Sequence, residues 1–236
     1  LLQGASKKTG QAIVQHPDLS AVAFTGSLMG GRAIMDAAAA RKKPIPVFAE
    51  MGSLNPVFLL PEALKKRSKD IATGFLNSLT MGVGQFCTNP GVLLALDSPE
   101  LDDFLKHLSD GIGRIQPRTM LHSGIFQNYN SILKIFCQTQ GVRIHTRSGI
   151  TSNPARIEAD TLVLETDYTT WCMREELRQE CFGPASIVIR IKNLEELLSF
   201  ARNMEGSLTA TIHGTHDDLE KYKSLLQALE THAGRL

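Results

Sequence analysis

The sequence lacks several features that would place it in a particular class of protein. It has no apolar run near the roughly 18 residues that cross a bilayer, and its start has neither the basic region nor the apolar core of a signal peptide. Its four cysteines form no C-x-x-C pair, and four in 236 residues do not suggest a disulfide framework. We therefore expect a cytoplasmic protein without a membrane partner, in a reducing setting where thiols stay free.

Charge of one sign and metal-ligand spacing are also missing. The formal net charge is +1, which gives no electrostatic reason to expect nucleic acid as a partner. Two short basic runs, at 41–43 and 65–67, stand beside expected helix ends and fit a solvated surface. The seven histidines are scattered without the spacing of a metal site, so we expect no bound metal.

Neither end of the sequence carries the signal of a chain terminus. No initiating Met is present, and the last residues, 233–236, carry no terminating signal. We expect a piece of a longer protein.

Short apolar strands alternate with helical stretches along most of the chain. Because continuous apolar strands are typical of sheets buried on both faces, the pattern predicts an α/β fold with a mainly parallel, doubly wound sheet. A loop is expected at 143–155, which is rich in Thr, Ser, Gly, Asn and Pro. Helices are expected at 5–15, 30–41, 62–81, 99–111, 123–140, 193–203 and 217–230, and strands at 21–24, 45–49, 56–60, 91–96, 161–165, 186–191 and 208–213.

One cysteine stands out by its setting. Cys87 lies in a glycine-flanked loop, Gly84 to Gly91, between a long helix and a buried strand. A thiol in such a loop can attack a carbonyl carbon, and nearby backbone N–H groups can meet the oxyanion that forms. Taken alone, a single cysteine is more often a small core residue. We expect Cys137 and Cys181 to be packing residues of that kind.

Two further segments carry candidate site residues. Glu50 follows an apolar strand and precedes Gly52, where a partly desolvated carboxylate can act as a general base; a helix cap or a salt-bridged Glu is an equal alternative. Thr25-Gly26-Ser27 ends a strand and begins a helix, which offers N–H groups and a hydroxyl to a phosphate. Without context, an N-cap by Ser27 or Thr25 is the better interpretation.

Together and in this order, these motifs resemble those of the aldehyde dehydrogenase superfamily. Phe24 to Ser27 is similar to its cofactor-binding turn, and Glu50 to Pro56 to its glutamate motif. Gly84 to Cys87 matches its nucleophile motif, and Glu180 to Pro184 resembles a fourth motif. Each is weak alone, but four in register along almost the whole chain are specific.

Some positions depart from the commonest pattern of the superfamily. The usual Leu-Gly-Gly-Lys after the glutamate is Met51-Gly52-Ser53-Leu54, and the usual small residue two places after the cysteine is Asn89. This variant resembles the branch that contains 2,5-dioxopentanoate (α-ketoglutarate semialdehyde) dehydrogenases and NADP-linked long-chain aldehyde dehydrogenases.

The resemblance implies a chemistry for these residues. Cys87 attacks an aldehyde to give a thiohemiacetal, hydride passes to NAD or NADP, and Glu50 activates the water that hydrolyses the resulting thioester. The Cys87 N–H is one oxyanion donor. In the cofactor site, Thr25, Gly26, Ser27 and Met51 lie near the pyrophosphate or nicotinamide, Glu180 contacts the nicotinamide ribose, and Phe182 packs by the nicotinamide. NADP is slightly favoured over NAD by the branch resemblance.

The resemblance also implies a domain layout and a substrate. Residues 1–49 correspond to the C-terminal part of an NAD(P)-binding domain, and residues 50–236 to a three-layer catalytic domain that is incomplete at its C-terminal end. The expected reaction is oxidation of 2,5-dioxopentanoate to 2-oxoglutarate, with a long-chain aliphatic aldehyde as the alternative. We expect the full-length protein to be a homo-oligomer and this stretch alone to be inactive, because part of the cofactor site and a second oxyanion donor lie outside it.

Two rival functions remain open. An acyl-phosphate or acyl-CoA reductase of the same architecture uses a cysteine and a nicotinamide but needs no water-activating glutamate, so Glu50 favours the dehydrogenase. A binding protein that has kept the fold without catalysis is the other rival. The presence of both Cys87 and Glu50 counts against it.

Overall fold

The computed structural model describes residue 2 and residues 6–236. The chain forms two compact units, residues 1–52 and residues 53–236. The sequence predicts a boundary after residue 49, and the units part after Gly52. Among the described residues, no helix combines the length and apolar character that a membrane crossing requires.

The first unit is a strand–helix–strand arrangement with one further helix. Strands β1 (Val22–Gly26) and β2 (Val47–Met51) pair in parallel, and helix α2 (Leu28–Ala39) connects them. Helix α1 (Lys7–Gln15) ends just before His16-Pro17, because a residue before proline is driven out of the helical region. The described residues of this unit that are fully buried are Val14, Gly31 and Ala38.

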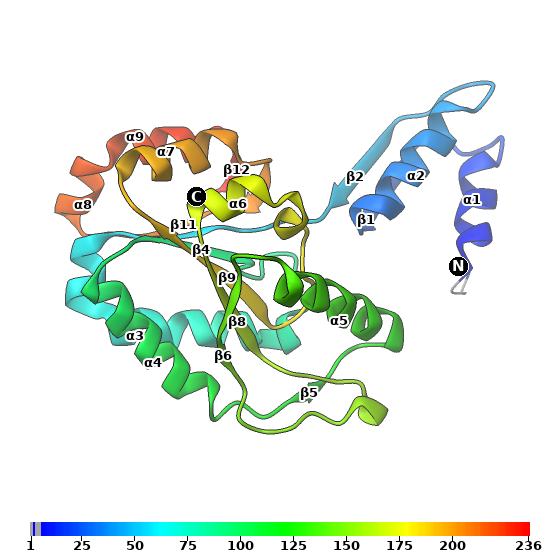
Figure 1. Cartoon of the computed structure of the whole chain (residues 1–236). Coiled ribbons are helices and arrows are strands. Elements are labelled where there is room, and N and C mark those ends of the chain that lie inside the picture. The colour runs from blue at the N-terminus through cyan, green and yellow to red at the C-terminus, as the bar shows by residue number, and fades with distance from the viewer. Residues whose placement is uncertain (1, 3–5) are drawn as a thin grey trace. The chain divides into compact units, whose positions relative to one another are not determined.

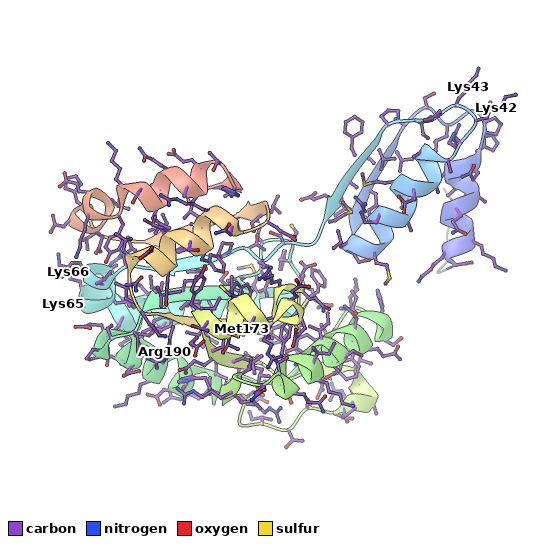
Figure 2. The ribbon with its side chains drawn as sticks, turned by 45° about the horizontal axis from the view of Figure 1, so that its top comes forward. Lys42, Lys43, Lys65, Lys66, Met173 and Arg190 are labelled. Carbon is purple, nitrogen blue, oxygen red and sulfur yellow. The ribbon has the colours of Figure 1, made fainter. Side chains whose placement is uncertain are left out.

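The basic run 41–43 is used in two ways. The Arg41 guanidinium donates hydrogen bonds to four main-chain carbonyls between Val14 and Leu19, and so ties the end of α1 to the end of α2. Lys42 and Lys43 are exposed at the turn before β2, as a solvated surface requires (Figure 2). Arg41 is therefore a structural residue of the first unit, which its place in a basic run did not indicate.

The second unit is built on a six-stranded sheet (Figure 1). All of its neighbouring strands are parallel except the edge strand β6, which runs antiparallel to β8. This confirms the predicted α/β fold with a mainly parallel sheet. In spatial order the strands are β11 (Thr211–His213), β3 (Val57–Leu59), β4 (Val92–Leu96), β9 (Ala185–Ile191), β8 (Leu162–Asp167) and β6 (Arg143–Arg147).

Helices bury both faces of this sheet. Helices α3 (Pro61–Thr80) and α4 (Pro99–Ile112) belong to one apolar core, in which the rings of Phe75 and Phe104 meet edge to face at 6.3 Å. The other core includes residues of α5 (Ser123–Gln138), α6 (Tyr168–Met173), α7 (Leu194–Asn203) and α9 (Lys223–Glu230). Burial on both sides explains why the central strands read as continuous apolar runs.

Three regions differ from the sequence prediction. Residues 143–147, expected in a loop, form β6, whose polar side chains suit an edge strand. The single strand expected at 208–213 is two strands, because β10 (Ser207–Thr209) pairs with β12 (Ala233–Arg235) while β11 joins the main sheet. The helix expected at 217–230 breaks at Tyr222 into α8 (His216–Lys221) and α9.

Short elements complete the unit. Strand β5 (Arg118–Thr119) pairs antiparallel with β7 (Glu158–Ala159). Three 3-10 turns are also present, at Met81–Gly84, Pro154–Arg156 and Glu175–Arg178.

A buried carboxylate joins the edge strand to the sheet. The Glu165 side chain on β8 is 3 % exposed and accepts hydrogen bonds from Arg143 on β6 and Arg190 on β9, each at 2.5 Å, while His145 Nδ1 lies 2.8 Å from it. Burial alone raises the pKa of Glu165, but the hydrogen bonds from His145, Arg190 and Arg143 outweigh it and bring the pKa to about 2. Glu165 is therefore charged in the folded protein well below neutral pH.

Replacing Glu165 tests this cluster. Because its pKa is lowered from 4.5 to about 2 on folding, its contribution to stability is present above about pH 4.5 and is lost as the pH falls toward 2. We expect Glu165→Gln to lower the free energy of unfolding by about 3 kcal/mol at pH 7, and the difference from wild type to shrink below pH 4.5. Urea unfolding followed by the fluorescence of Trp171, the only tryptophan, measures the free energy of unfolding of the second unit.

Asp97→Asn is the matched control. Asp97 also binds Arg190, at 2.5 Å, but its side chain is 58 % exposed, so its loss costs less than about 1 kcal/mol. Equal costs for the two variants would contradict the central role of Glu165.

Candidate active site

Cys87 lies in the loop that leads from the end of α3 to the amino end of β4. It is exposed. Just before it, Gly82, Val83 and Gly84 all have left-handed backbone, with φ of 54°, 61° and 65°. This conformation is rare for a β-branched residue, and Val83 is held in it by packing against the core. The chain thus enters the Cys87 loop through a strained turn.

The Cys87 loop rests on the segment that leads into β9. A Cβ at Gly84 would lie 2.3 Å from the carbonyl carbon of Gly183, and a Cβ at Gly183 would lie 2.3 Å from the ring of Tyr129. Tyr129 is itself fixed by a 2.7 Å hydrogen bond from its hydroxyl to the Asp160 carbonyl. The Asn89 Nδ2 donates to the Gly183 carbonyl at 3.0 Å. Glycine is required at Gly84 because the Gly183 main chain leaves no room for a Cβ, and at Gly183 because the fixed Tyr129 ring fills that space.

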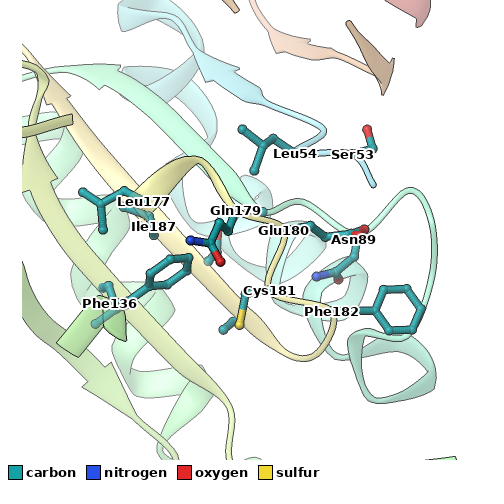
Figure 3. A pocket seen from close by; sticks show the side chains of 14 residues that line it. Ser53, Leu54, Asn89, Phe136, Leu177, Gln179, Glu180, Cys181, Phe182 and Ile187 are labelled. Atoms are coloured by element: carbon teal, nitrogen blue, oxygen red, sulfur yellow. The ribbon is translucent and has the colours of Figure 1, made fainter. Parts of the chain in front are cut away.

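Two predicted cofactor residues of the second unit meet this loop at one pocket (Figure 3). Glu180 is half-buried, and burial raises the pKa of its carboxyl, an effect that a hydrogen bond with the Ser53 backbone partly offsets. Phe182 is partly exposed. Asn89, Glu180 and Phe182 all line the pocket, whereas Cys87 is not among its lining residues. Other lining residues are Ser53, Leu54, Phe136, Gln179, Cys181 and Ser186.

The neighbouring cysteines are not alternative nucleophiles. Burial raises the pKa of the Cys181 thiol far above its usual range, and nearby Glu180 and Cys137 raise it further. Burial also raises the pKa of the Cys137 thiol. Both side chains pack against the apolar core, which confirms the packing role predicted for them. The exposed thiols are those of Cys87 and Cys172, and only Cys87 lies in the glycine-flanked loop.

The remaining predicted residues belong to the first unit. Thr25 and Gly26 end β1, and they pair in register with Glu50 and Met51 of β2. All four therefore lie at the carboxyl ends of two neighbouring parallel strands. Ser27 caps α2, because its Oγ accepts from the Gly30 N–H at 3.2 Å. The N-cap interpretation of Ser27 is thus confirmed as its structural role.

Glu50 differs from its expected environment. It is exposed rather than partly desolvated. It lies in β2 rather than at a helix cap, and it makes no salt bridge with any described residue. Its carboxylate is therefore not committed to a structural role within the first unit.

Sequence reasoning missed the residue that lies beneath the Cys87 loop. Asn55 is 3 % exposed, and its Nδ2 donates to the carbonyls of Cys87 and Asn89. Its φ of 46° is a left-handed value that Asn tolerates better than most residues. The only signal for Asn55 in the sequence was its place directly before Pro56.

The fold and site together describe an α/β protein with an exposed thiol on a fixed loop. Comparison with known proteins identifies the family. The sequence profile of the aldehyde dehydrogenase family matches residues 1–122. The chain belongs to the aldehyde dehydrogenase family.

Two curated relatives match nearly the whole chain. Alpha-ketoglutaric semialdehyde dehydrogenase 2 of Azospirillum brasilense is 41 % identical over 100 % of this chain and 45 % of its own length. Alpha-ketoglutaric semialdehyde dehydrogenase of Acinetobacter baylyi is 37 % identical over 97 % of this chain and 43 % of its own length. The chain therefore spans less than half the length of these relatives.

Solved structures share the fold. Apo betaine aldehyde dehydrogenase of Staphylococcus aureus superposes with a TM-score of 0.80 at 21 % identity, over 98 % of this chain and 46 % of its own. A benzaldehyde dehydrogenase of Corynebacterium glutamicum superposes with a TM-score of 0.79 at 17 % identity, over 98 % and 49 %. The fold is that of the aldehyde dehydrogenases.

Gly84→Ala tests the main-chain contact beneath the Cys87 loop. The added Cβ collides with Gly183 and strains a left-handed residue, so we expect unit 2 to lose at least about 2 kcal/mol of stability. Urea unfolding followed by Trp171 fluorescence measures the loss. Gly74→Ala is the control: this helical glycine has open space around its Cβ position, and the change is expected to add about 1 kcal/mol. A tolerated Gly84→Ala would show that the two main chains do not need to approach so closely.

Proposed function

We propose that the whole protein oxidises an aldehyde to a carboxylic acid with NAD(P)+, with Cys87 as nucleophile and Glu50 as base. The observation that carries this proposal is the exposed Cys87 thiol on a main chain fixed from two sides, by Asn55 and by the Gly183 segment. Membership of the aldehyde dehydrogenase family supports it.

Cys87 has the surroundings that acyl chemistry needs. Its thiolate attacks the aldehyde carbon, and the sulfur carries the acyl group as a thioester after oxidation. The Cys87 N–H takes part in none of the hydrogen bonds between described residues, which leaves this donor available to an oxyanion. Removal of Cys87 removes the covalent intermediate itself.

Glu50 completes the hydrolytic half of the reaction in this proposal. Its carboxylate takes a proton from water, the water oxygen attacks the thioester carbon, and the thiolate of Cys87 leaves. No described residue forms a salt bridge with Glu50, which suits this role. A reductase that transfers its acyl group to phosphate or a thiol has no need of such a base.

The residues present fit a nicotinamide dinucleotide. The N–H groups of Leu28 and Met29 in the first turn of α2 donate to no described residue, and they suit a pyrophosphate beside Thr25, Gly26 and Ser27. Met51, Glu180 and Phe182 would lie at the nicotinamide end, with the half-buried Glu180 carboxylate accepting from a ribose hydroxyl. When bound, the cofactor supplies the hydride acceptor. Residues 1–49 then belong to the cofactor domain and residues 50–236 to the catalytic domain, with NADP slightly favoured over NAD.

The proposed substrate is 2,5-dioxopentanoate, oxidised to 2-oxoglutarate. The names of the two curated relatives, at 41 % and 37 % identity, support it. A long-chain aliphatic aldehyde is the second candidate. Exposed apolar side chains near Cys87 favour it, because Phe86 is 47 % exposed and Met81 is 59 % exposed. Leu121, another exposed apolar residue, is tied to the Cys87 loop by a hydrogen bond from its N–H to the Gln85 side chain.

A substrate panel on the full-length protein tests this proposal. We expect NAD(P)H formation with 2,5-dioxopentanoate at a kcat/KM at least tenfold above that for hexanal or decanal. Cys87→Ala should abolish it, whereas Cys172→Ala, which removes the other exposed thiol, should leave it unchanged. A higher kcat/KM for decanal would select the second candidate. Normal turnover by Cys87→Ala, or no turnover of any aldehyde by the wild type, would overturn the proposal.

Glu50→Gln separates the two halves of the reaction. Because acylation of Cys87 does not need this base, we expect a burst of NAD(P)H close to one equivalent per active site. Steady-state turnover should then be slower by about 100-fold or more. Stopped-flow absorbance at 340 nm follows both phases. A variant that loses the burst but keeps fast deacylation would assign Glu50 a different step.

A further inference from the structure

Asn55 makes the densest set of hydrogen bonds near the candidate nucleophile. Asn55 lies in the chain just before β3, and its side chain is buried beneath the Cys87 loop. Its Nδ2 donates to the Cys87 carbonyl at 2.8 Å and to the Asn89 carbonyl at 2.9 Å. Both N–H groups of the carboxamide are therefore used on the nucleophile loop.

The carboxamide oxygen of Asn55 is fixed from the other side. It accepts from the Ser53 hydroxyl at 2.7 Å, and from both the main-chain N–H and the hydroxyl of Thr209 at 3.1 Å. The Ser53 hydroxyl oxygen in turn accepts from the Leu208 N–H at 2.9 Å. Because every polar atom of the side chain is engaged, Asn55 has one orientation that satisfies all its partners.

A second contact holds the same two segments together. The Gly91 N–H donates to the Leu54 carbonyl at 2.9 Å, and a Cβ at Gly91 would lie 2.9 Å from that oxygen. Leu54 and Asn55 thus hydrogen-bond to the Cys87 loop at three of its residues, Cys87, Asn89 and Gly91. Gly183 contacts the opposite end of the same loop, at Gly84.

We propose that Asn55 is a positioning residue that sets the main-chain position of Cys87 for catalysis. This inference rests on the proposed function of Cys87. The Asn55 side chain hydrogen-bonds to the Cys87 carbonyl and not to its thiol. It therefore affects the position of the sulfur rather than the reactivity of the thiol. A shift of about 1 Å in a reacting atom can lower a rate by about 100-fold.

Asn55→Asp in the full-length protein is the direct test. Aspartate keeps the shape, the left-handed backbone and the acceptors for Ser53 and Thr209, but it removes both donors to the loop. We expect kcat with the preferred aldehyde to fall at least tenfold and KM to change less than threefold. The rate of Cys87 alkylation by iodoacetamide, read from the Cys87 peptide by mass spectrometry, should change less than threefold, because the thiol stays exposed and intact.

Two further variants keep the outcome decisive. Asn55→Gly tolerates the positive φ and removes the whole carboxamide, so it should show the same fall in kcat if Asn55→Asp does not fold. Ser98→Ala removes the N-cap of α4, where Ser98 accepts from the Leu101 N–H, and so destabilises the fold away from the site. Its kcat should match that of the wild type.

Each other result overturns a specific statement. An Asn55→Asp protein with kcat within twofold of wild type overturns the positioning role, and so does a rise in KM alone. Alkylation that falls in parallel with kcat also overturns it, because the thiol chemistry would then be lost. A wild-type protein that turns over no aldehyde overturns the proposed function, and the positioning role with it.

Discussion

The contact between the main chains at Gly84 and Gly183 is the constraint on which the candidate site depends. The two glycines belong to the loops that lead into neighbouring parallel strands, β4 and β9. Since a Cβ at Gly84 would collide with the Gly183 main chain, the Cys87 loop and the Glu180–Pro184 segment can come together only with glycine at 84, while glycine at 183 makes room for the Tyr129 ring. That approach brings Asn89 of the nucleophile loop to the same pocket as Glu180 and Phe182.

The two ends of the second unit's sheet carry different groups. The Cys87 loop and the Glu180 segment precede the amino ends of β4 and β9. In most open α/β sheets, ligands instead bind beyond the carboxyl ends. In this unit, the carboxyl ends carry ion pairs of Arg190 with Glu165, Asp97 and Asp102. The burial of Glu165 among Arg143, His145 and Arg190 suits this end to stability, whereas the strained backbone of Gly82 to Gly84 lies before the other end of the sheet.

Most of the fold was predictable because its central strands are buried on both faces. The apolar runs that became β4 and β9, and the period of the helices that became α3, α4 and α5, appear directly in the sequence. The edge strand β6 was missed because its polar sequence, Arg143 to Arg147, is stabilised by Glu165, a partner far along the chain. The break at Ala210 was missed because one apolar run supplies strands to two different sheets.

The candidate residues of the site were predictable only as local motifs. The setting of Cys87 between glycines and its register with other motifs made it a candidate, and Glu180 and Phe182 were proposed in the same way. Asn55 was not, because its importance comes from hydrogen bonds to Cys87, Asn89 and Thr209, which are distant in sequence. The exposure of Glu50 was also missed, since a short apolar strand does not reveal which of its faces is covered.

In the proposed reaction, Cys87 carries the acyl group during aldehyde oxidation. The most direct measurement is acid quenching of the full-length Glu50→Gln protein during turnover with aldehyde and NAD(P)+, followed by mass spectrometry of the Cys87 peptide. We predict that this peptide gains the mass of the substrate acyl group, and that the peptides of Cys137, Cys172 and Cys181 do not. NAD(P)H formation with an unmodified Cys87 peptide, or with the acyl group on another residue, would contradict it.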